Sequence, residues 1–366
     1  QIWQHAGHKA AALGTLGVVS DDLSTSGSLT TPDPVTLHKL LSDLAGRGVD
    51  RLALEASSHG LDQFRLDGVR VSAAAFTNLS RDHLDYHGTM DAYLSAKVRL
   101  FSDVLIPGGV AVLNADTPEC ASIKTACEAR GHTAITYGYA GDAIRLVSTT
   151  ATAHGQELDL LLHGKVEHVA LPLAGGFQAM NALCAAGLAL ATGMTTEQVI
   201  DALAALDGVP GRLERVGATE TGASVFVDYA HTPDALTIAL NALRPHAKGK
   251  LAVVFGAGGD RDAGKRPLMG QAAQDAADIA YVTDDNPRSE DPAIIRAAIL
   301  KNCSDAIEVD DRADAIESAI SSLDDGDVLL IAGKGHETGQ IVGETILPFD
   351  DRDVARAALK KSGGAS

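Results

Sequence analysis

The chain has 366 residues, a length typical of roughly two or three domains. A hydrophobic content of 45% and a charged content of 21% are ordinary for a globular protein with a real core. The formal net charge of −18 argues against nucleic acid or an anionic membrane as a partner, because both require clustered Lys and Arg.

Four cysteines, Cys120, Cys127, Cys184 and Cys303, form no CxxC pair. Scattered cysteines indicate free thiols in a reducing compartment, so we expect a cytoplasmic protein. The sequence contains no apolar run of about 18 residues and no secretory signal. Residues 1–9 lack an initiator Met and carry apolar residues at helical spacing, so we interpret the chain as a fragment that lacks an upstream part.

Short apolar runs alternate with helical patterns in the first part of the chain, which predicts parallel βα units. We expect strands at residues 13–19, 51–55, 73–78 and 110–114 of one sheet. The last three run into the polar strings ASSHGLDQ, NLSRDHLDYHG and NADTPE. Because ligands bind beyond the carboxyl ends of parallel strands, these strings predict a site. The alternative is that they are simply solvated strand ends.

The rest of the chain indicates an antiparallel extension and a second α/β domain. Residues 144–173 alternate as strands do, residues 181–193 form an Ala-rich helical pattern, and residues 207–216 are typical of a hinge. A second set of parallel strands is expected at residues 224–228, 251–255, 279–283 and 328–331. Each of these strands is also followed by a polar string.

Seven strings in order along the chain resemble those of the Mur ligase family: TTPDPVTLHKL, EASSHGLDQFR, TNLSRDHLDYHGTMDAYLSAKVRLF, VDYAHTPDAL, GGDRDAGKRPLM, DDNPR and AGKGHE. The resemblance covers essentially the whole chain. It implies an α/β fold with a central ATPase-type domain over residues 1–211, built on a parallel sheet with a small antiparallel extension. A Rossmann-like C-terminal domain that binds the amino acid is implied over residues 212–366.

The family resemblance also implies a reaction. It is the ATP-dependent addition of meso-2,6-diaminopimelate to UDP-N-acetylmuramoyl-L-alanyl-D-glutamate, through an acyl phosphate, in peptidoglycan biosynthesis. Such chemistry needs a metal to neutralise crowded phosphates, cations to hold anions, and exclusion of water. The implied metal is Mg²⁺, ATP is a co-substrate, and the partners are small molecules. We expect the protein to act as a monomer.

Three residues are implied to hold the metal and to take part in catalysis: Glu55, His83 and Lys97. Carboxylate oxygen suits Mg²⁺ well and imidazole less well, and a single His such as His83 is more often a hydrogen-bonding loop residue. Lys97 lies in a helical pattern at residues 90–101, where a lysine is usually a surface residue. The resemblance implies instead that Lys97 is carbamylated by CO₂, which reacts with a neutral amine and leaves an anion able to bind metal.

Two further sets of contacts are implied by the resemblance. Contacts to the UDP-muramoyl-dipeptide are expected from Thr30, Thr31, Ser57, Gln63 and Arg65. Contacts to ATP are expected from Asn181 at the adenine, Arg212 at phosphate, and Asp228, Tyr229 and His231 near the ribose. The alternatives are a turn and helix start at residues 31–34, an ordinary core helix around Asn181, and a helix cap at Asp228.

The predicted amino-acid site is centred on Asp285, Asn286, Pro287 and Arg288. Diaminopimelate carries a distal carboxylate that lysine lacks, and Arg288 can bind it in a bidentate manner while Asn286 adds polar contacts. The resemblance adds Arg261, Gly333 and Glu337, with Glu337 placed for the distal ammonium. The alternative is a surface turn built by Asn-Pro.

The 366 residues contain no GxxxxGK[ST] phosphate-binding loop, so we expect this polypeptide by itself to bind ATP poorly and to be inactive. Three alternative functions remain open: a fragment that only binds substrate, a lysine-adding homologue, and a folate-polyglutamylating enzyme. The DNPR string argues against lysine addition, and the strings at residues 30–65 argue against folate.

Overall fold

A computed structural model describes residues 1–20, 22–25, 27, 29–80 and 82–364. The chain forms two compact units. Unit 1 comprises Gln1–Thr149, Leu158–Leu171 and Met180–Leu206, and unit 2 comprises Thr150–Glu157, Pro172–Ala179 and Asp207–Ser366. Within the described residues, every helix is too short or too polar to span a bilayer. The domain boundary expected between residues 211 and 212 stays a prediction.

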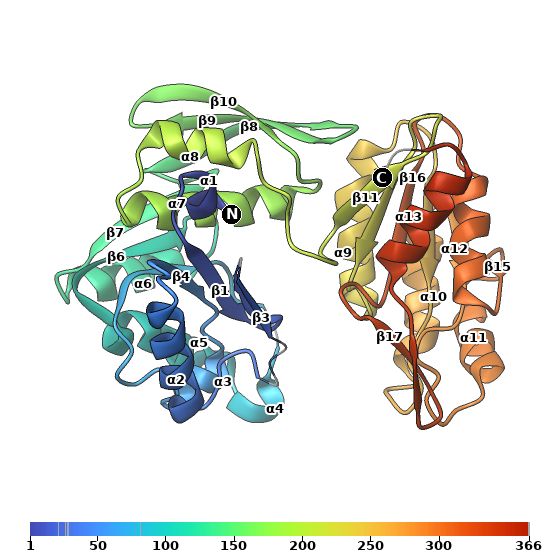
Figure 1. The fold of residues 1–366 in the computed structure, drawn as a ribbon, viewed down its shortest axis with the longest axis horizontal. Coiled ribbons are helices and arrows are strands. Elements are labelled where there is room, and N and C mark those ends of the chain that lie inside the picture. The colour runs from blue at the N-terminus through green and yellow to red at the C-terminus, as the bar shows by residue number, and fades with distance from the viewer. Residues whose placement is uncertain (21, 26, 28, 81, 365–366) are drawn as a thin grey trace. The chain divides into compact units, whose positions relative to one another are not determined.

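The first sheet of unit 1 has the strand order β3-β2-β1-β4 (Figure 1). Its strands are β1 (Ala10–Gly14), β2 (Gly17–Ser20), β3 (Leu23–Thr25) and β4 (Arg51–Leu54). Strand β4 confirms the strand predicted at residues 51–55. The single strand predicted at residues 13–19 is wrong, because β1 and β2 form an antiparallel hairpin in which Leu13 pairs with Val18. Gly17 has a φ of 83°, a conformation that glycine adopts without strain and that lets the chain reverse there.

The second sheet has the order β10-β9-β8-β7-β6-β5. Its strands are β5 (Val71–Phe76), β6 (Leu105–Asn114), β7 (Thr133–Gly138), β8 (Ile144–Thr152), β9 (Gly155–Leu162) and β10 (Lys165–Leu171). Strands β5 to β8 pair in parallel. The connections from β8 to β9 and from β9 to β10 are too short for a parallel crossover, which confirms the antiparallel extension. The three polar strings thus follow strands of two sheets, and not of one as predicted.

Helices alternate with these strands, and their starts are encoded locally. Asp33 caps one helix by accepting hydrogen bonds from the amides of Val35 and Thr36, with Pro34 in its first turn. The predicted helical patterns at residues 90–101 and 181–193 are confirmed by helices over Met90–Arg99 and Gly176–Ala191. The helices are α1 (Ile2–His5), α2 (Pro34–Gly46), α3 (Ser58–Asp62), α4 (Leu84–His87), α5 (Met90–Arg99), a π-helical turn (Leu100–Val104), α6 (Cys120–Glu128), α7 (Gly176–Ala191) and α8 (Thr196–Leu203).

Unit 2 contains a sheet of order β11-β12-β16-β13-β14-β15. Its strands are β11 (Glu214–Ala218), β12 (Ser224–Asp228), β13 (Leu251–Phe255), β14 (Ile279–Val282), β15 (Ile307–Glu308) and β16 (Val328–Ala332), and a separate hairpin joins β17 (Gly339–Val342) to β18 (Thr345–Pro348). All strands of the sheet run parallel except β11. The four strands predicted for this part of the chain are confirmed to within one residue.

Helices cover both faces of this sheet (Figure 1). Strand side chains alternate between two cores, since Val253 and Leu330 pack in one cluster while Val254 and Leu329 pack in the other. One face is covered by α9 (Pro233–Leu243), α10 (Lys265–Ala276) and α11 (Pro292–Leu300), and the other by α12 (Arg312–Ser321) and α13 (Asp351–Lys361). The carboxyl ends of β12, β16, β13 and β14 therefore lie at one uncovered edge, where a ligand can be bound.

Candidate active-site residues

Glu55 follows β4 directly, and its amide continues the ladder by donating to Leu13 O at 2.8 Å. The carboxylate oxygen Oε2 accepts hydrogen bonds from Thr15 N at 3.0 Å and Thr15 Oγ1 at 3.1 Å. A Cβ at Gly14 would lie 2.6 Å from this oxygen, so glycine is needed for the carboxylate to rest against the β1–β2 turn. The side chain is exposed, and Oε1 accepts no hydrogen bond from a described residue.

His83 and Lys97 both contact the ring of Tyr93. The His83 ring is 5.9 Å from the Tyr93 ring, and Lys97 Nζ is 4.8 Å from the same ring, one turn along α5. Burial lowers the pKa of Lys97, while the carboxylates of Asp82 and Glu55 act in the opposite direction. His83 and Lys97 therefore share Tyr93 as a neighbour, and Lys97 lies within electrostatic reach of Glu55. The spacing of Tyr93 and Lys97 on a helix could have revealed the contact from the sequence.

A cluster of rings surrounds His83 and was not predicted. His59 lies 4.9 Å from His83, and His87 stacks on Tyr93 at 5.1 Å. Burial lowers the pKa of His59, with smaller contributions from the neighbouring histidines. His83 itself has a φ of 53°, and its amide donates to Asp82 Oδ1 at 2.8 Å. These contacts hold the imidazole in a defined place.

Among the described residues, no group of three or more His, Cys, Asp or Glu side chains is arranged to hold a metal ion. A full set of protein ligands is what Zn²⁺ and Ca²⁺ need. Mg²⁺ instead takes one or two carboxylates and completes its shell with water and substrate phosphates. An exposed carboxylate with one oxygen unused, as at Glu55, fits Mg²⁺.

The residues predicted to bind the UDP-muramoyl-dipeptide form one hydrogen-bonded network in unit 1. The buried Thr31 hydroxyl donates to Glu55 O at 2.8 Å and accepts from Ser57 N at 3.0 Å. Arg65 donates to Thr31 O at 2.9 Å and to Gln63 Oε1 at 3.1 Å. The cap at Asp33 shows that the turn interpretation of residues 31–34 also holds.

Four more residues extend that network. Gln63 Nε2 donates to Tyr86 Oη at 3.1 Å, and Tyr86 Oη donates to Asp62 Oδ2 at 2.8 Å. Thr30 Oγ1 lies 3.0 Å from Thr15 Oγ1. Tyr86 was missed in the sequence, although it lies in the HLDYHG string. The network presents hydroxyl, amide and guanidinium groups, which suit phosphate and carboxylate oxygens.

Four of the five residues predicted to bind ATP lie in unit 2. Asp228 ends β12, and its carboxylate accepts from Leu213 N at 2.7 Å and Ala230 N at 2.8 Å. Burial raises the pKa of Asp228 in spite of these bonds. Asn181 lies on α7 in unit 1, so neither unit alone contains the whole predicted ATP set.

Tyr229 is the centre of the unit 2 group. The Arg212 guanidinium carbon is 4.9 Å from its ring centroid, and the rings of His231 and His336 lie at 4.5 Å and 5.2 Å. Burial lowers the pKa of His336, which favours the neutral form of its imidazole. His336 was missed in the sequence, where the AGKGHE string was its signal. Aromatic faces with a nearby guanidinium suit a purine nucleotide.

The loop that follows β14 holds the predicted amino-acid site. Asp285, Asn286 and Pro287 are buried. Arg288 is half-buried, has a φ of 50°, and donates from Nη1 to Gly259 O at 2.8 Å. Its backbone bonds Ile341 O and Gly343 N at 3.0 and 2.7 Å. This backbone pairing with the β17–β18 hairpin holds Arg288, while Nε and Nη2 donate to no described residue.

Loops from β13 and β16 meet the β14 loop. Gly259 N donates to Asn286 O at 2.9 Å, and a Cβ at Gly259 would lie 1.9 Å from Pro287 O. A Cβ at Gly333 would lie 2.7 Å from Asp285 Oδ2. Asn286 Nδ2 donates to Glu337 Oε2 at 3.1 Å. The structure thus brings the predicted residues of three loops together at the carboxyl edge of the unit 2 sheet.

Arg261 belongs to this neighbourhood through Gly258. A Cβ placed on Gly258 would lie 3.8 Å from Arg261 Cγ and 2.8 Å from Arg288 Nη1. Arg261 is exposed, and its Nη1 donates to Asp260 O at 3.1 Å. The Arg288 guanidinium and the Arg261 side-chain stem therefore lie beside the same glycine, which puts two cationic residues at this edge.

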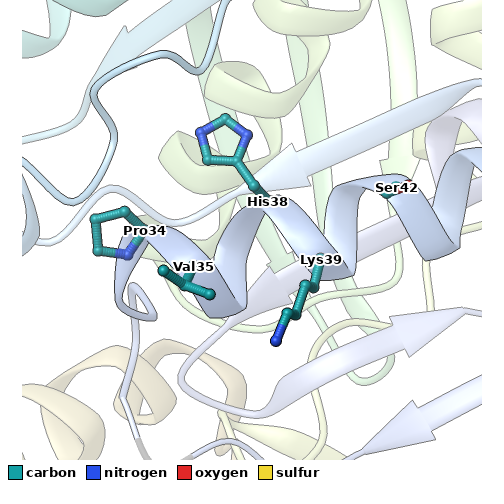
Figure 2. Close-up of a pocket in the computed structure, with 5 residues that line it drawn as sticks. All are labelled: Pro34, Val35, His38, Lys39 and Ser42. Carbon is teal, nitrogen blue, oxygen red and sulfur yellow. The ribbon is translucent and has the colours of Figure 1, made fainter.

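A pocket elsewhere in unit 1 contains none of the predicted site residues. It has a volume of about 490 Å³ and lies along the first turns of α2, lined by Pro34, Val35, His38, Lys39 and Ser42 (Figure 2). All five side chains come from one helix. Such an open surface offers little convergent chemistry.

Two family models match the chain. Residues 1–189 match the Mur ligase middle domain, and residues 211–335 match the Mur ligase glutamate ligase domain. The first of these covers more than half of the chain.

Two similar proteins and one solved structure carry the same name. The chain is 56% identical over 363 residues to a UDP-N-acetylmuramoyl-L-alanyl-D-glutamate–2,6-diaminopimelate ligase of Bradyrhizobium diazoefficiens. The matched region covers 98% of this chain and 75% of that protein. The chain is 54% identical over 357 residues to the protein of the same name from Caulobacter vibrioides, with 96% and 74% covered. A solved structure of a ligase of that name superposes with a TM-score of 0.77 at 36% identity, over 99% of this chain and 74% of that one.

Proposed function

The chain belongs to the Mur ligase family, and we propose that it adds meso-2,6-diaminopimelate to UDP-N-acetylmuramoyl-L-alanyl-D-glutamate in an ATP-dependent reaction of peptidoglycan synthesis. The observation that carries this proposal is that Asn286 contacts both the half-buried Arg288, through its backbone oxygen, and Glu337, through its side chain. A fixed guanidinium and a carboxylate that share Asn286 as a neighbour complement the carboxylate and the ammonium of a distal amino-acid head.

In the reaction, the terminal phosphoryl group of ATP is transferred to the glutamate carboxylate of the dipeptide, which gives an acyl phosphate and ADP. The diaminopimelate amine then attacks the acyl carbon, an amide bond forms, and phosphate leaves with the electrons of the broken C–O bond. Transfer of this kind depends on positioning and on neutralising phosphate charge. The chain supplies Arg65 and Thr30 to the dipeptide and Arg212 to phosphate.

Glu55, His83 and Lys97 would hold Mg²⁺, which supplies the positive charge that phosphate oxygens need. Lys97 is suited to carbamylation, because burial lowers its pKa and so raises the fraction of neutral amine that CO₂ can attack. The resulting carbamate would add an anionic oxygen ligand near the Glu55 carboxylate. The carboxylate of Asp82, whose charge also raises the pKa of Lys97, would add negative charge that attracts the cation.

Discrimination against lysine follows from the same geometry. Lysine has a distal ammonium but no distal carboxylate, so it would leave the Arg288 fork without a partner. An unpartnered charged donor in a half-buried site is costly. The folate alternative is disfavoured because the strings at residues 30–65 resemble those that contact the UDP-muramoyl-dipeptide in the Mur ligases.

We propose that the protein acts as a cytoplasmic monomer on small molecules alone. All four cysteines are buried and free, in keeping with a reducing compartment. Burial raises the pKa of Cys127 and of Cys184 to about 11, so both thiols stay protonated and unreactive at neutral pH. Size measurement by light scattering checks the monomer.

The 366 residues lack a GxxxxGK[ST] loop, and we propose that this polypeptide by itself binds ATP weakly. Catalysis is therefore measured with the product of the complete reading frame. Phosphate release that depends on the amine is followed with meso-diaminopimelate and with L-lysine. We expect kcat/KM to be at least about 100-fold higher for diaminopimelate. Equal values for the two amines would refute the proposed function.

A further inference from the structure

Lys334 is fully buried next to the proposed amino-acid site, and no role has been given to it above. It lies in the loop after β16, and its Nζ donates to three oxygens: Asn286 Oδ1 at 3.2 Å, Glu337 Oε2 at 3.3 Å and Gly339 O at 2.6 Å. Taking an ammonium group out of water is costly unless acceptors replace the water. The three acceptors use all three ammonium protons, so Lys334 has none left for a ligand.

The contact with Lys334 determines how the Asn286 amide is oriented. Asn286 Oδ1 accepts from Lys334 Nζ at 3.2 Å and from Ile341 N at 2.9 Å. Two donors converge on this atom, which identifies it as the oxygen and not the nitrogen. Nδ2 is then directed to Glu337 Oε2, to which it donates at 3.1 Å. Without the Lys334 proton, one of the two contacts that set this orientation is lost.

The Glu337 carboxylate is held by the same lysine. Its Oε2 accepts from both Lys334 Nζ and Asn286 Nδ2. Its Oε1 accepts from no described residue, and the side chain is 35% exposed. One oxygen is therefore engaged by protein donors, and the other is available to a ligand. Since carboxylates bind ammonium groups, the free oxygen is suited to the distal ammonium of the substrate.

Two glycines fix the backbone on either side of Lys334. Gly333 has a φ of 121°, and a Cβ there would lie 2.7 Å from Asp285 Oδ2. Gly335 has a φ of 54°, and a Cβ there would lie 2.7 Å from Tyr229 Cβ. The loop can thus pack closely only because both flanking residues lack a side chain. This packing directs Lys334 inward, where it meets Asn286 and Glu337.

We propose that Lys334 is a positioning residue that gives the site its preference for a distal ammonium group, through Glu337 and Asn286. The carboxylate half of the distal head is recognised separately by Arg288. The inference rests on the proposed function, because it divides recognition of diaminopimelate between two sets of protein groups. It assigns to Lys334 an effect on specificity that a purely structural lysine would not have.

Three amines separate the two halves of the distal head. Meso-diaminopimelate carries both the distal ammonium and the distal carboxylate. L-2-Aminopimelate keeps the carboxylate and lacks the ammonium, and L-lysine keeps the ammonium and lacks the carboxylate. The value of kcat/KM is measured for each amine by phosphate release, with the product of the complete reading frame.

The variants are Lys334→Met, which keeps length and removes the charge, and Lys334→Gln, which keeps a shorter donor. Arg288→Met is the comparison, and Lys301→Met, at an exposed residue after α11, is the control. We expect Lys334→Met to reduce the preference for diaminopimelate over 2-aminopimelate at least about tenfold, with a smaller loss for Lys334→Gln. The preference over lysine should change less than about threefold, because lysine loses the same contact. Arg288→Met should instead reduce the preference for diaminopimelate over lysine and leave the preference over 2-aminopimelate nearly unchanged.

Melting curves show which variants are folded. If Lys334→Met does not fold, the preferences are compared with Lys334→Gln instead. A folded Lys334 variant that keeps the full preference over 2-aminopimelate would overturn the inference. So would an equal loss of both preferences, which indicates general damage to the loop. A wild-type protein that does not use diaminopimelate contradicts the proposed function itself, and that result is seen before any variant is made.

Discussion

At the scale of single residues, the proposed specificity depends on where one guanidinium group is held. Arg288 has a left-handed backbone and is bonded on both sides to the β17–β18 hairpin. Its Nη1 is engaged by Gly259 O, while Nε and Nη2 have no partner among the described residues. A guanidinium held in this way is ready for a carboxylate, because little conformational freedom is left to lose on binding.

Arg288→Met should lower kcat/KM for diaminopimelate by about 100-fold, or about 2.7 kcal/mol, because the distal carboxylate loses a charged fork. The value for lysine should change little, since lysine has no group at that place. Arg70→Met, at an exposed residue of unit 1, is the control. A loss of equal size with both amines would show that Arg288 acts on the fold and not on the substrate.

Lys97→Ala should lower kcat by at least about 100-fold, because the anionic ligand made by carbamylation is lost. Added bicarbonate should not restore activity, since no amine remains to react, whereas a short exogenous carboxylic acid should restore part of it. Lys39→Ala, at an exposed lysine on α2, is the matched control. Normal turnover by the Lys97 variant would exclude the proposed role.

At the scale of elements, close packing of a helix on a strand depends on a single glycine. Gly187 is buried on α7, and a Cβ there would lie 2.5 Å from Val112 Cγ1 on β6. Val112 is itself fully buried, so it has little room to move. The pattern of small residues in α7 thus allows the helix to approach the sheet.

Gly187→Ala should lower the free energy of unfolding of unit 1 by about 1–3 kcal/mol, because the added methyl overpacks the contact with β6. Gly46→Ala makes the same change at the end of α2, where nothing lies within 4 Å. That control should raise stability by about 0.4–1 kcal/mol through the unfolded state. Both are measured by urea unfolding, and the same sign for the two variants would contradict the packing argument.

A buried ion pair joins two helices of unit 2. Arg312 Nε and Nη2 donate to Asp351 Oδ1 and Oδ2 at 2.7 and 2.8 Å, and both side chains are fully buried at the starts of α12 and α13. Arg312 Nη2 also donates to Ala332 O at 3.0 Å, at the end of β16. The pair therefore contacts the backbone immediately before the loop that carries Gly333 and Lys334.

Asp351→Ala should destabilise unit 2 by about 3–5 kcal/mol, because it leaves the Arg312 charge buried without a partner. The double variant Arg312→Met/Asp351→Leu should recover most of that loss, since no charge is then buried. Lys361→Ala is the control, because it breaks an exposed ion pair with Glu317 between the same two helices and should change little. A double variant as unstable as Asp351→Ala would contradict this account.

At the scale of the whole molecule, each of the two units has hydrophobic cores of its own. Among the described residues, the clusters around Leu113 and around Leu37 consist of unit 1 residues, and the clusters around Phe255 and around Ile331 consist of unit 2 residues. Separate cores allow separate cooperative transitions, so a single free energy of unfolding does not describe the chain.

Calorimetry should show two unfolding transitions. Gly187→Ala should lower the midpoint temperature of one, and Asp351→Ala should lower the midpoint temperature of the other. Diaminopimelate should raise only the transition that Asp351→Ala lowers, because every residue proposed to bind it belongs to unit 2. At a concentration 100 times the dissociation constant, the stabilisation should be about 2.7 kcal/mol. A single transition moved by both variants would show instead that the units unfold together.

The sequence by itself determined four parallel strands of unit 2 and the identity of the candidate residues. Strands 224–228 and 251–255 coincide with β12 and β13, because buried parallel strands are continuous apolar runs bounded by polar strings. The strings from EASSHG to AGKGHE indicated the family and therefore the site residues. Local patterns suffice for such features because they depend on neighbours in the chain.

Only the tertiary structure decided which side chains meet and how they are oriented. Residues 13–19 look like one strand, yet the pairing of Leu13 with Val18 and the positive φ of Gly17 make them a hairpin. Nothing in the AGKGHE string distinguishes Lys334, and its burial against Asn286 and Glu337 is visible only once three loops come together. Contacts of this kind depend on residues that are far apart in the chain, and no local pattern records them.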